Sequence, residues 1–190
     1  MWIVIDGYNV IRRSPQLHPI DRRDLQEGRE ALLTTLAAYR RLKGHRITVV
    51  FDGWEQGGIS EQVRLTAGLQ VVFSRRRERA DQVIVRFVEK APSGAVVVTS
   101  DRALADDVAR TGALVLSAEE FHERLDLALR EGDEGEFQKD DESVPESPGP
   151  RRLKGPARRP SRQDKRRGST LKRLGVRGEI DRSRVPKPGA

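Results

Sequence analysis

Three aspartates directly follow strand-like apolar segments. Asp6 follows W-I-V-I, Asp52 follows I-T-V-V-F, and Asp101 ends V-V-V-T-S-D. The carboxyl ends of parallel strands share one edge of a sheet, and ligands bind in the crevice outside that edge. Asp81, at the start of a predicted helix, is expected to join the other three. The sequence therefore predicts four carboxylates around one cleft.

Carboxylates gathered in this way repel one another, and a divalent cation would relieve the repulsion. Mg²⁺ and Mn²⁺ prefer oxygen ligands, polarise phosphoryl oxygens and lower the pKa of bound water. An acid-lined cleft of this kind is a candidate phosphodiesterase site. The alternative for each single aspartate is a helix cap or a turn. Three equivalent strand ends together with Asp81 favour the metal site.

The segments that position these residues alternate between strand and helix patterns. Short apolar runs predict strands, and apolar residues at helical spacing predict helices. Asp24 is expected to cap the first long helix and Gly44 to end it. Residues 54–69 are ambiguous, with a loop at Gly57-Gly58 and a helical turn at 61–65. The predicted strands are 2–5, 47–51, 69–73, 95–98 and 114–116, and the predicted helices are 25–42, 80–90, 104–109 and 118–129.

Strands that are almost wholly apolar and alternate with helices predict an α/β fold. Its central, mostly parallel sheet is expected to be covered by helices on both faces, in three layers. We expect this domain to span residues 1–130. Asp6 to Gly7 is interpreted as a strand that runs into a loop, and a further loop is expected around Pro15 and Pro19.

The last 60 residues have a different composition. Residues 131–150 form an acidic, Pro- and Gly-containing linker, and residues 151–190 hold 15 Lys and Arg against three acids, a net charge of +12 in a chain of net charge +7. We predict no packed fold there, although residues 171–176 are expected to form a local turn on binding. A disordered basic tail suits a polyanionic partner, most often nucleic acid, whereas a non-specific solubilising tail is the alternative.

Several classes of site are excluded. The chain has no cysteine, no P-loop pattern and no G-x-S-x-G elbow, and its three histidines lie far from one another in sequence. Disulfides, thiolate metal sites and typical zinc sites are therefore not expected. The sequence shows no membrane-spanning run and no signal-peptide pattern, so we expect a cytoplasmic protein.

Four short motifs occur in order along this α/β frame. They are D-G-Y-N at 6–9, V-V-F-D-G at 49–53, R-A-D-Q at 79–82 and V-T-S-D at 98–101. Their order and spacing resemble NYN domains, whose PIN-like fold is a nuclease scaffold. The arrangement looks most like the bacterial YacP-like branch, which includes a ribosome-associated endoribonuclease. The resemblance covers roughly residues 1–130.

The resemblance implies a role for each acidic residue. Asp6, Asp81 and Asp101 would hold Mg²⁺ or Mn²⁺, with Asp52 as the fourth acid and Asp106 as its competitor. Relatives often carry a second acid beside the position of Asp81.

The neighbouring polar residues would support these acids. Asn9 would position Asp6 or a water, and Ser100 or Thr99 would support Asp101. The chain departs from its relatives at Gln82, which replaces their second acid and makes the cleft less acidic.

Substrate contacts are expected from cations and aromatic side chains around the motifs. Arginines beside the acids could hold a nucleic-acid backbone, although a solvated charged loop is the alternative for the cluster before Asp81. Tyr8 or Trp54 could stack on an unpaired base, with ordinary packing as the alternative. The candidate substrate-binding arginines are Arg12, Arg75, Arg77, Arg79 and Arg102, with Arg13 and Arg76 beside them.

We therefore expect a metal-dependent endoribonuclease. By analogy with PIN-like enzymes, hydrolysis would leave a 5′-phosphate and a 3′-hydroxyl. RNA is the expected partner, with mRNA on the ribosome as the setting. Two alternatives stay open. One is a catalytically inactive RNA- or ribosome-binding module, which the departure at Gln82 supports. The other is a structure-specific DNA nuclease.

Overall fold

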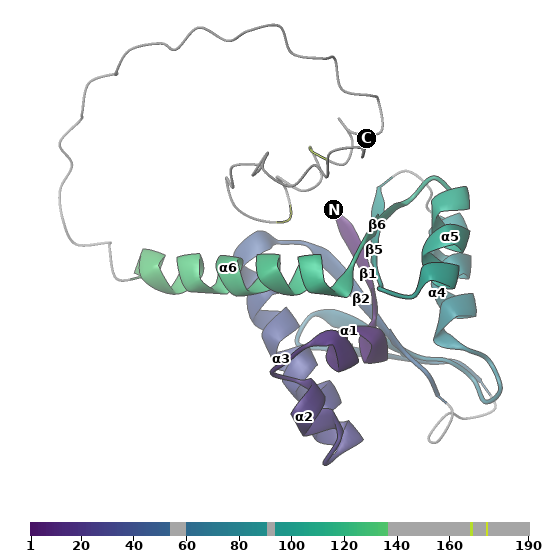
Figure 1. The fold of residues 1–190 in the computed structure, drawn as a ribbon, viewed down its shortest axis with the longest axis horizontal. Coiled ribbons are helices and arrows are strands. Elements are labelled where there is room, and N and C mark those ends of the chain that lie inside the picture. The colour runs from purple at the N-terminus through teal and green to yellow at the C-terminus, as the bar shows by residue number, and fades with distance from the viewer. Residues whose placement is uncertain (54–59, 91–93, 137–167, 169–173, 175–190) are drawn as a thin grey trace, which may run out of the picture.

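A six-stranded sheet organises the protein (Figure 1). The structure, a computed structural model, describes residues 1–53, 60–90, 94–136, 168 and 174. Predictions about Trp54 and the 57–58 glycines fall outside these residues, as do those about nearly all of 137–190. In chain order the strands are β1 (Trp2–Asp6), β2 (Arg46–Phe51), β3 (Gln62–Thr66), β4 (Leu69–Phe73), β5 (Ala95–Val98) and β6 (Leu114–Leu116).

The strands lie in the order β3-β4-β2-β1-β5-β6. All neighbouring pairs are parallel except β3 with β4. Strand β1 lies at the centre, with Ile3 paired to Ile47 on one side and to Val96 on the other. These residues are fully or almost fully buried, which explains the unbroken apolar runs in the sequence.

Helices cover both faces of the sheet (Figure 1). Buried residues of α1, α3 and α6 share one core cluster with the sheet, and buried residues of α4 and α5 share the other. The predicted three-layer α/β architecture is confirmed. The helices are α1 (Gly7–Arg13), α2 (His18–Asp21), α3 (Leu25–Lys43), α4 (Ala80–Glu89), α5 (Arg102–Arg110) and α6 (Ala118–Glu136).

The predicted boundaries of α3 are confirmed by its caps. The Asp24 carboxylate accepts hydrogen bonds from the backbone N–H groups of Gln26 and Glu27, at 2.6 and 3.0 Å. Gly44 ends the helix with a positive φ of 66°, a conformation that glycine adopts without steric cost.

Two local predictions are wrong. Residues 7–13 form α1 rather than a loop, because Asp6 caps the helix. Residues 62–66 form β3 rather than a helical turn, joined to β4 by a tight turn in which Ala67 and Gly68 both have positive φ. Strand β3 is a mostly exposed edge of only five residues: Q-V-R-L-T alternates polar and apolar residues, but its two apolar side chains, Val63 and Leu65, are exposed rather than buried.

Two further differences concern helix extent. The expected loop around Pro19 contains the short helix α2, and α6 continues past the predicted end at 129 to Glu136. Gly132 lies against Leu42 of α3, so the second half of α6 still contacts the domain. No helix in the described part of the chain is long and apolar enough to cross a membrane.

One residue of the basic tail is packed, which its composition does not predict. Leu174 is fully buried in the core cluster that also contains Tyr39 and Phe121. The Tyr39 hydroxyl donates a hydrogen bond to the Leu174 carbonyl. A contact between residues 135 positions apart therefore joins Leu174 to α3.

The strand order reverses at β1. The chain leaves β1 through α1, α2 and α3 on one face to reach β2, whereas α4 on the opposite face leads to β5 on the other side of β1. In open α/β sheets, ligands bind at such a switch in strand order, outside the carboxyl ends of the strands. The ends of β1 and β5 meet at this point.

Candidate active site

Asp6 lies at the centre of the site, at the carboxyl end of β1. One carboxylate oxygen accepts a hydrogen bond from the Asn9 backbone N–H at 3.3 Å, and the other accepts one from the Thr99 hydroxyl at 3.2 Å. Only 8% of the residue is exposed. Burial, opposed by these two hydrogen bonds and reinforced by the charges of Asp81 and Asp52, raises the pKa of Asp6 to about 6.

The loop after β5 is held against Asp6 by two side chains. The Asn9 amide oxygen accepts a hydrogen bond from the Ser100 backbone N–H at 2.8 Å. The Thr99 hydroxyl oxygen accepts one from the Asp101 backbone N–H at 3.1 Å, while its proton bonds Asp6. Asn9 and Thr99 thus fix the spacing between the two predicted metal ligands.

Asp101 caps α5. Its carboxylate accepts hydrogen bonds from the backbone N–H groups of Ala103 and Leu104, at 2.8 and 3.1 Å. Of the two side chains predicted to support Asp101, Thr99 contacts it. Ser100 instead donates to Glu119 at 2.5 Å and accepts from the Ala118 N–H.

Asp52 and Asp81 complete the predicted set from β2 and α4. The exposed Asp52 carboxylate accepts a hydrogen bond from the Ala80 backbone N–H at 2.6 Å, which places it beside Asp81. Asp81 forms an ion pair with Arg79 at 2.8 Å. Gln82 bonds the Arg79 backbone N–H and so serves as part of the helix cap.

The charges of neighbouring acids raise the pKa values of Asp6 and Asp81. The pKa of Asp81 is raised by burial, opposed by Arg79 and reinforced by the charges of Asp101 and Asp52. Asp6 in turn responds to Asp81 and Asp52. The four predicted acids therefore form one coupled set. Asp106, the competing fourth acid, is exposed and does not contribute to either shift.

The chemistry of this set fits a hard divalent cation, although the present arrangement is not a closed site. In the described part of the chain, no three acidic or histidine side chains stand close enough together to hold a metal ion. Asp81 is engaged by Arg79, whose side chain is 74% exposed. An ion pair this exposed is worth about 0–1 kcal/mol, so a cation could displace the guanidinium at small cost.

The sequence analysis missed a fifth acid near the cleft. Glu119, in the first turn of α6, accepts the Ser100 hydrogen bond and pairs with Arg13 at 3.5 Å. The Ser100 hydrogen bond, with a contribution from Arg13, holds the pKa of Glu119 below its usual range. No motif marked Glu119, because its position depends on how α6 packs beside the β5 loop.

The predicted substrate-binding arginines differ in whether they line the pocket beside the acids. Arg12 and Arg79 line a pocket beside Asp52. Arg75 instead pairs with the buried Glu78 at 3.2 Å, which favours a structural role. Arg77 is exposed in a loop with a φ of 69°, and Arg102 is exposed at the start of α5.

Asp6 gives the metal-free protein an unusual pH dependence. The folded state retains the Asp6 proton up to about pH 6, whereas the unfolded chain releases it near 3.8. Stability is therefore lost as the pH rises through this window, by up to about 3 kcal/mol for a shift of this size. We expect urea unfolding in EDTA to show Asp6→Asn gaining stability over wild type between pH 4 and pH 7. A stability difference that does not change with pH would contradict the raised pKa.

Comparison with known proteins places these features in a family. A family model described as YacP-like NYN domain matches residues 3–154. The Bacillus subtilis (strain 168) protein YacP is 31% identical over 131 residues, which cover 67% of this chain and 76% of that protein. The sequence resemblance and the α/β fold are thereby confirmed.

Solved structures agree with this result. A crystal structure of Rae1 (YacP) from Bacillus subtilis has a TM-score of 0.62 and 26% identity, covering 73% of this chain and 80% of that one. A crystal structure of a mutant of the same protein has the same TM-score and 24% identity, with 76% and 86% covered.

Proposed function

The chain belongs to the YacP-like NYN domain family, and we propose that it is a metal-dependent endoribonuclease that hydrolyses RNA phosphodiester bonds. The family points to a nuclease-type function related to RNA. One observation supports the finer proposal: Asp6, Asp52, Asp81 and Asp101 form one electrostatically coupled set at the switch in strand order.

Asp6, Asp81 and Asp101 would hold Mg²⁺ or Mn²⁺, with Asp52 as the fourth acid. The cation would polarise a phosphoryl oxygen and lower the pKa of a water molecule, which is the chemistry that phosphodiester hydrolysis requires. Burial supports this assignment because a desolvated carboxylate such as Asp6 gains more from a cation than a solvated one.

The other residues of the cleft would orient these ligands. Thr99 joins Asp6 to the backbone of Asp101, which would hold the two acids at a fixed spacing. Asn9 joins α1 to the β5 loop and would hold the two segments together. Arg79 would exchange its contact with Asp81 for a substrate phosphate once the carboxylate binds a cation.

The basic tail would add affinity for the substrate. Its net charge of +12 suits RNA, either free or as mRNA on the ribosome, through release of counterions from phosphates. This contribution would fall steeply with salt concentration, whereas the coupled acids would act only at the cleaved bond.

The proposal is tested by cleavage assays with the purified full chain. We expect single-stranded RNA to be cut internally in Mn²⁺ or Mg²⁺, to leave 5′-phosphate ends, and to stay intact in EDTA. Cleavage should return when Mn²⁺ is added in excess, because the carboxylates remain in place without the metal.

The substrates in this assay separate the rival functions. RNA that is bound but not cut, on translating ribosomes as well, would overturn the enzyme and favour an inactive binding module. Preferential cleavage of flap DNA over RNA would instead indicate a structure-specific DNA nuclease. Cleavage that is unchanged in EDTA would contradict the role of the metal.

A further inference from the structure

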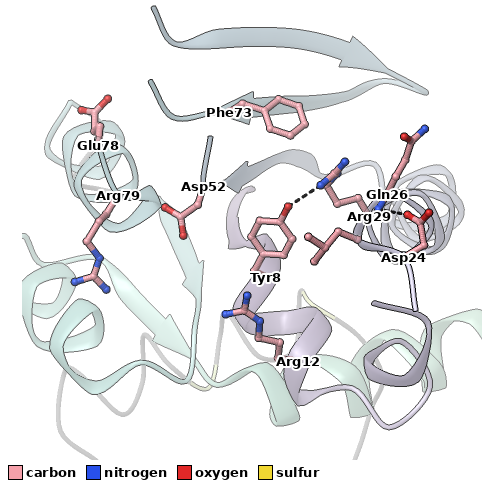
Figure 2. Close-up of a pocket in the computed structure, with 10 residues that line it drawn as sticks. Tyr8, Arg12, Asp24, Gln26, Arg29, Asp52, Phe73, Glu78 and Arg79 are labelled. Atoms are coloured by element: carbon pink, nitrogen blue, oxygen red, sulfur yellow. Dashed lines mark hydrogen bonds between the residues drawn. The ribbon is translucent and has the colours of Figure 1, made fainter. Parts of the chain in front are cut away.

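A pocket of about 620 Å³ opens beside the coupled acids. Its walls come from α1, the start of α3, the end of β4 and the segment before α4 (Figure 2). Asp52 belongs to both the pocket and the acid set, so an occupant would lie next to the catalytic groups. The volume is typical of small-ligand sites, which span about 300–1,000 Å³.

Two aromatic side chains and a guanidinium build the interior (Figure 2). Arg29 donates a hydrogen bond to the Tyr8 hydroxyl at 2.7 Å, and its guanidinium lies 5.9 Å from the centre of the Phe73 ring. Both rings pack against Phe51, with centroid distances of 5.1 Å for Tyr8 and 5.6 Å for Phe73. Phe51 thereby holds both rings in place, and the Arg64 guanidinium from β3 lies 5.7 Å from the centre of the Phe73 ring.

Arg79, one of the three arginines that line the pocket, pairs with Asp81, whereas the other two are held by aromatic rings. Among the described residues, neither Arg12 nor Arg29 forms an ion pair with a carboxylate. Arg12 lies over the Tyr8 ring at 5.4 Å, and Arg29 is held by the Tyr8 hydroxyl and Phe73. Guanidinium groups held by rings rather than by carboxylates can still donate hydrogen bonds to a phosphate.

The edge of the pocket is lined by one acidic and one neutral polar side chain. Asp24 and Gln26 line it at the start of α3, beside Leu25. Side chains of this kind can hydrogen-bond the edge of a nucleobase. Flat apolar walls, phosphate-binding cations and a polar edge together match the three chemical parts of one nucleotide.

We infer that this pocket binds one unpaired nucleotide of the RNA next to the cleaved bond, an inference that rests on the proposed function. The base packs against Tyr8 and Phe73, and a phosphate contacts Arg12 and Arg29. A base in a duplex cannot enter, because its faces are covered by its stacked neighbours. The pocket therefore selects single-stranded RNA.

Binding without cleavage tests this inference separately from the enzyme. The probes are a short single-stranded oligoribonucleotide that contains 2-aminopurine and the duplex of the same sequence. Fluorescence anisotropy is measured with the full-length Asp6→Asn protein at about 0.3–0.5 M salt. Salt at this concentration weakens RNA binding by the basic tail. We expect a further Arg29→Ala substitution to weaken binding of the single strand about 10-fold and of the duplex less than about 2-fold.

Three more variants make the test specific. Phe73→Leu should reduce the quenching of 2-aminopurine that stacking produces, because only the Tyr8 ring then remains. Arg12→Ala, at an exposed position, should weaken the single strand about 3- to 10-fold even if Arg29→Ala fails to fold. Arg110→Ala removes the same charge from α5, where Arg110 pairs with Asp107, and should change binding less than about 2-fold.

The outcomes are distinguishable from failure of the nuclease proposal. Selective loss of single-strand binding in a protein that never cuts RNA would support the pocket and refute the enzyme. Cleavage by wild type, together with unchanged affinity and quenching in the Arg12, Arg29 and Phe73 variants, would overturn the pocket alone. Equal weakening of single strand and duplex would also overturn it.

Discussion

Replacing Asp6 by asparagine is expected to lower the rate of RNA cleavage by at least about 10³-fold, which corresponds to several kcal/mol of transition-state stabilisation. The substitution removes the charge that a cation requires. It retains an oxygen that can accept the hydrogen bond from the Asn9 N–H and an amide that can bond Thr99. Because burial already disfavours the charged form of Asp6, the variant should also be more stable than wild type at neutral pH.

Rates are measured with a single-stranded RNA in excess Mn²⁺, next to RNA binding and thermal unfolding. Asp81→Asn and Asp101→Asn should show losses of the same order, because both acids belong to the coupled set. Asp106→Asn is the matched control, since this exposed residue lies on α5 outside the set, and its rate should stay within about 2-fold of wild type. Wild-type cleavage by Asp6→Asn would remove the central acid from the mechanism.

Replacing Leu174 by alanine is expected to destabilise the protein by about 2–4 kcal/mol, although the residue lies in the basic tail. Its side chain is fully buried in the cluster of Tyr39 and Phe121, so truncation leaves a cavity. Urea unfolding at fixed pH measures the change. Leu65→Ala, the same substitution at a leucine that is 80% exposed on β3, should cost less than about 0.5 kcal/mol.

A second substitution tests the same contact from the other side. Tyr39→Phe removes the hydroxyl that bonds the Leu174 carbonyl, and burial already raises the pKa of this hydroxyl to about 12. We expect a loss of about 1 kcal/mol that largely disappears in the Leu174→Ala background. If Leu174→Ala is as stable as wild type, the Leu174 side chain does not pack on α3.

The elements that carry the acids could be predicted because burial on both faces makes parallel strands wholly apolar. The aspartates at the ends of β1 and β5 also admitted a second interpretation, as helix caps. The cap interpretation is confirmed for Asp6 and Asp101, which cap α1 and α5. The metal site that the same two carboxylates would share stays a prediction. A cap holds a carboxylate in place and leaves part of it available for another partner.

Features that depend on tertiary packing could not be predicted. Strand β3 is an exposed edge whose pairing with β4 is fixed by a two-residue turn. Glu119 reaches the site only because α6 follows β6 beside β5. Arg29 and Phe73 meet across α3 and β4, 44 positions apart, with no local pattern to link them. The packing of Leu174 likewise contradicts what its basic surroundings suggest.

The central place of β1 has a consequence for how the protein is made. Its two partners end at residues 51 and 98, so β1 must wait for nearly a hundred residues to be synthesised before its second edge is covered. Pairings so distant in sequence form slowly and late. Asp6 and Asp101 would therefore come together only after most of the domain has emerged from the ribosome, and a nascent chain would hold an incomplete set of acids until then.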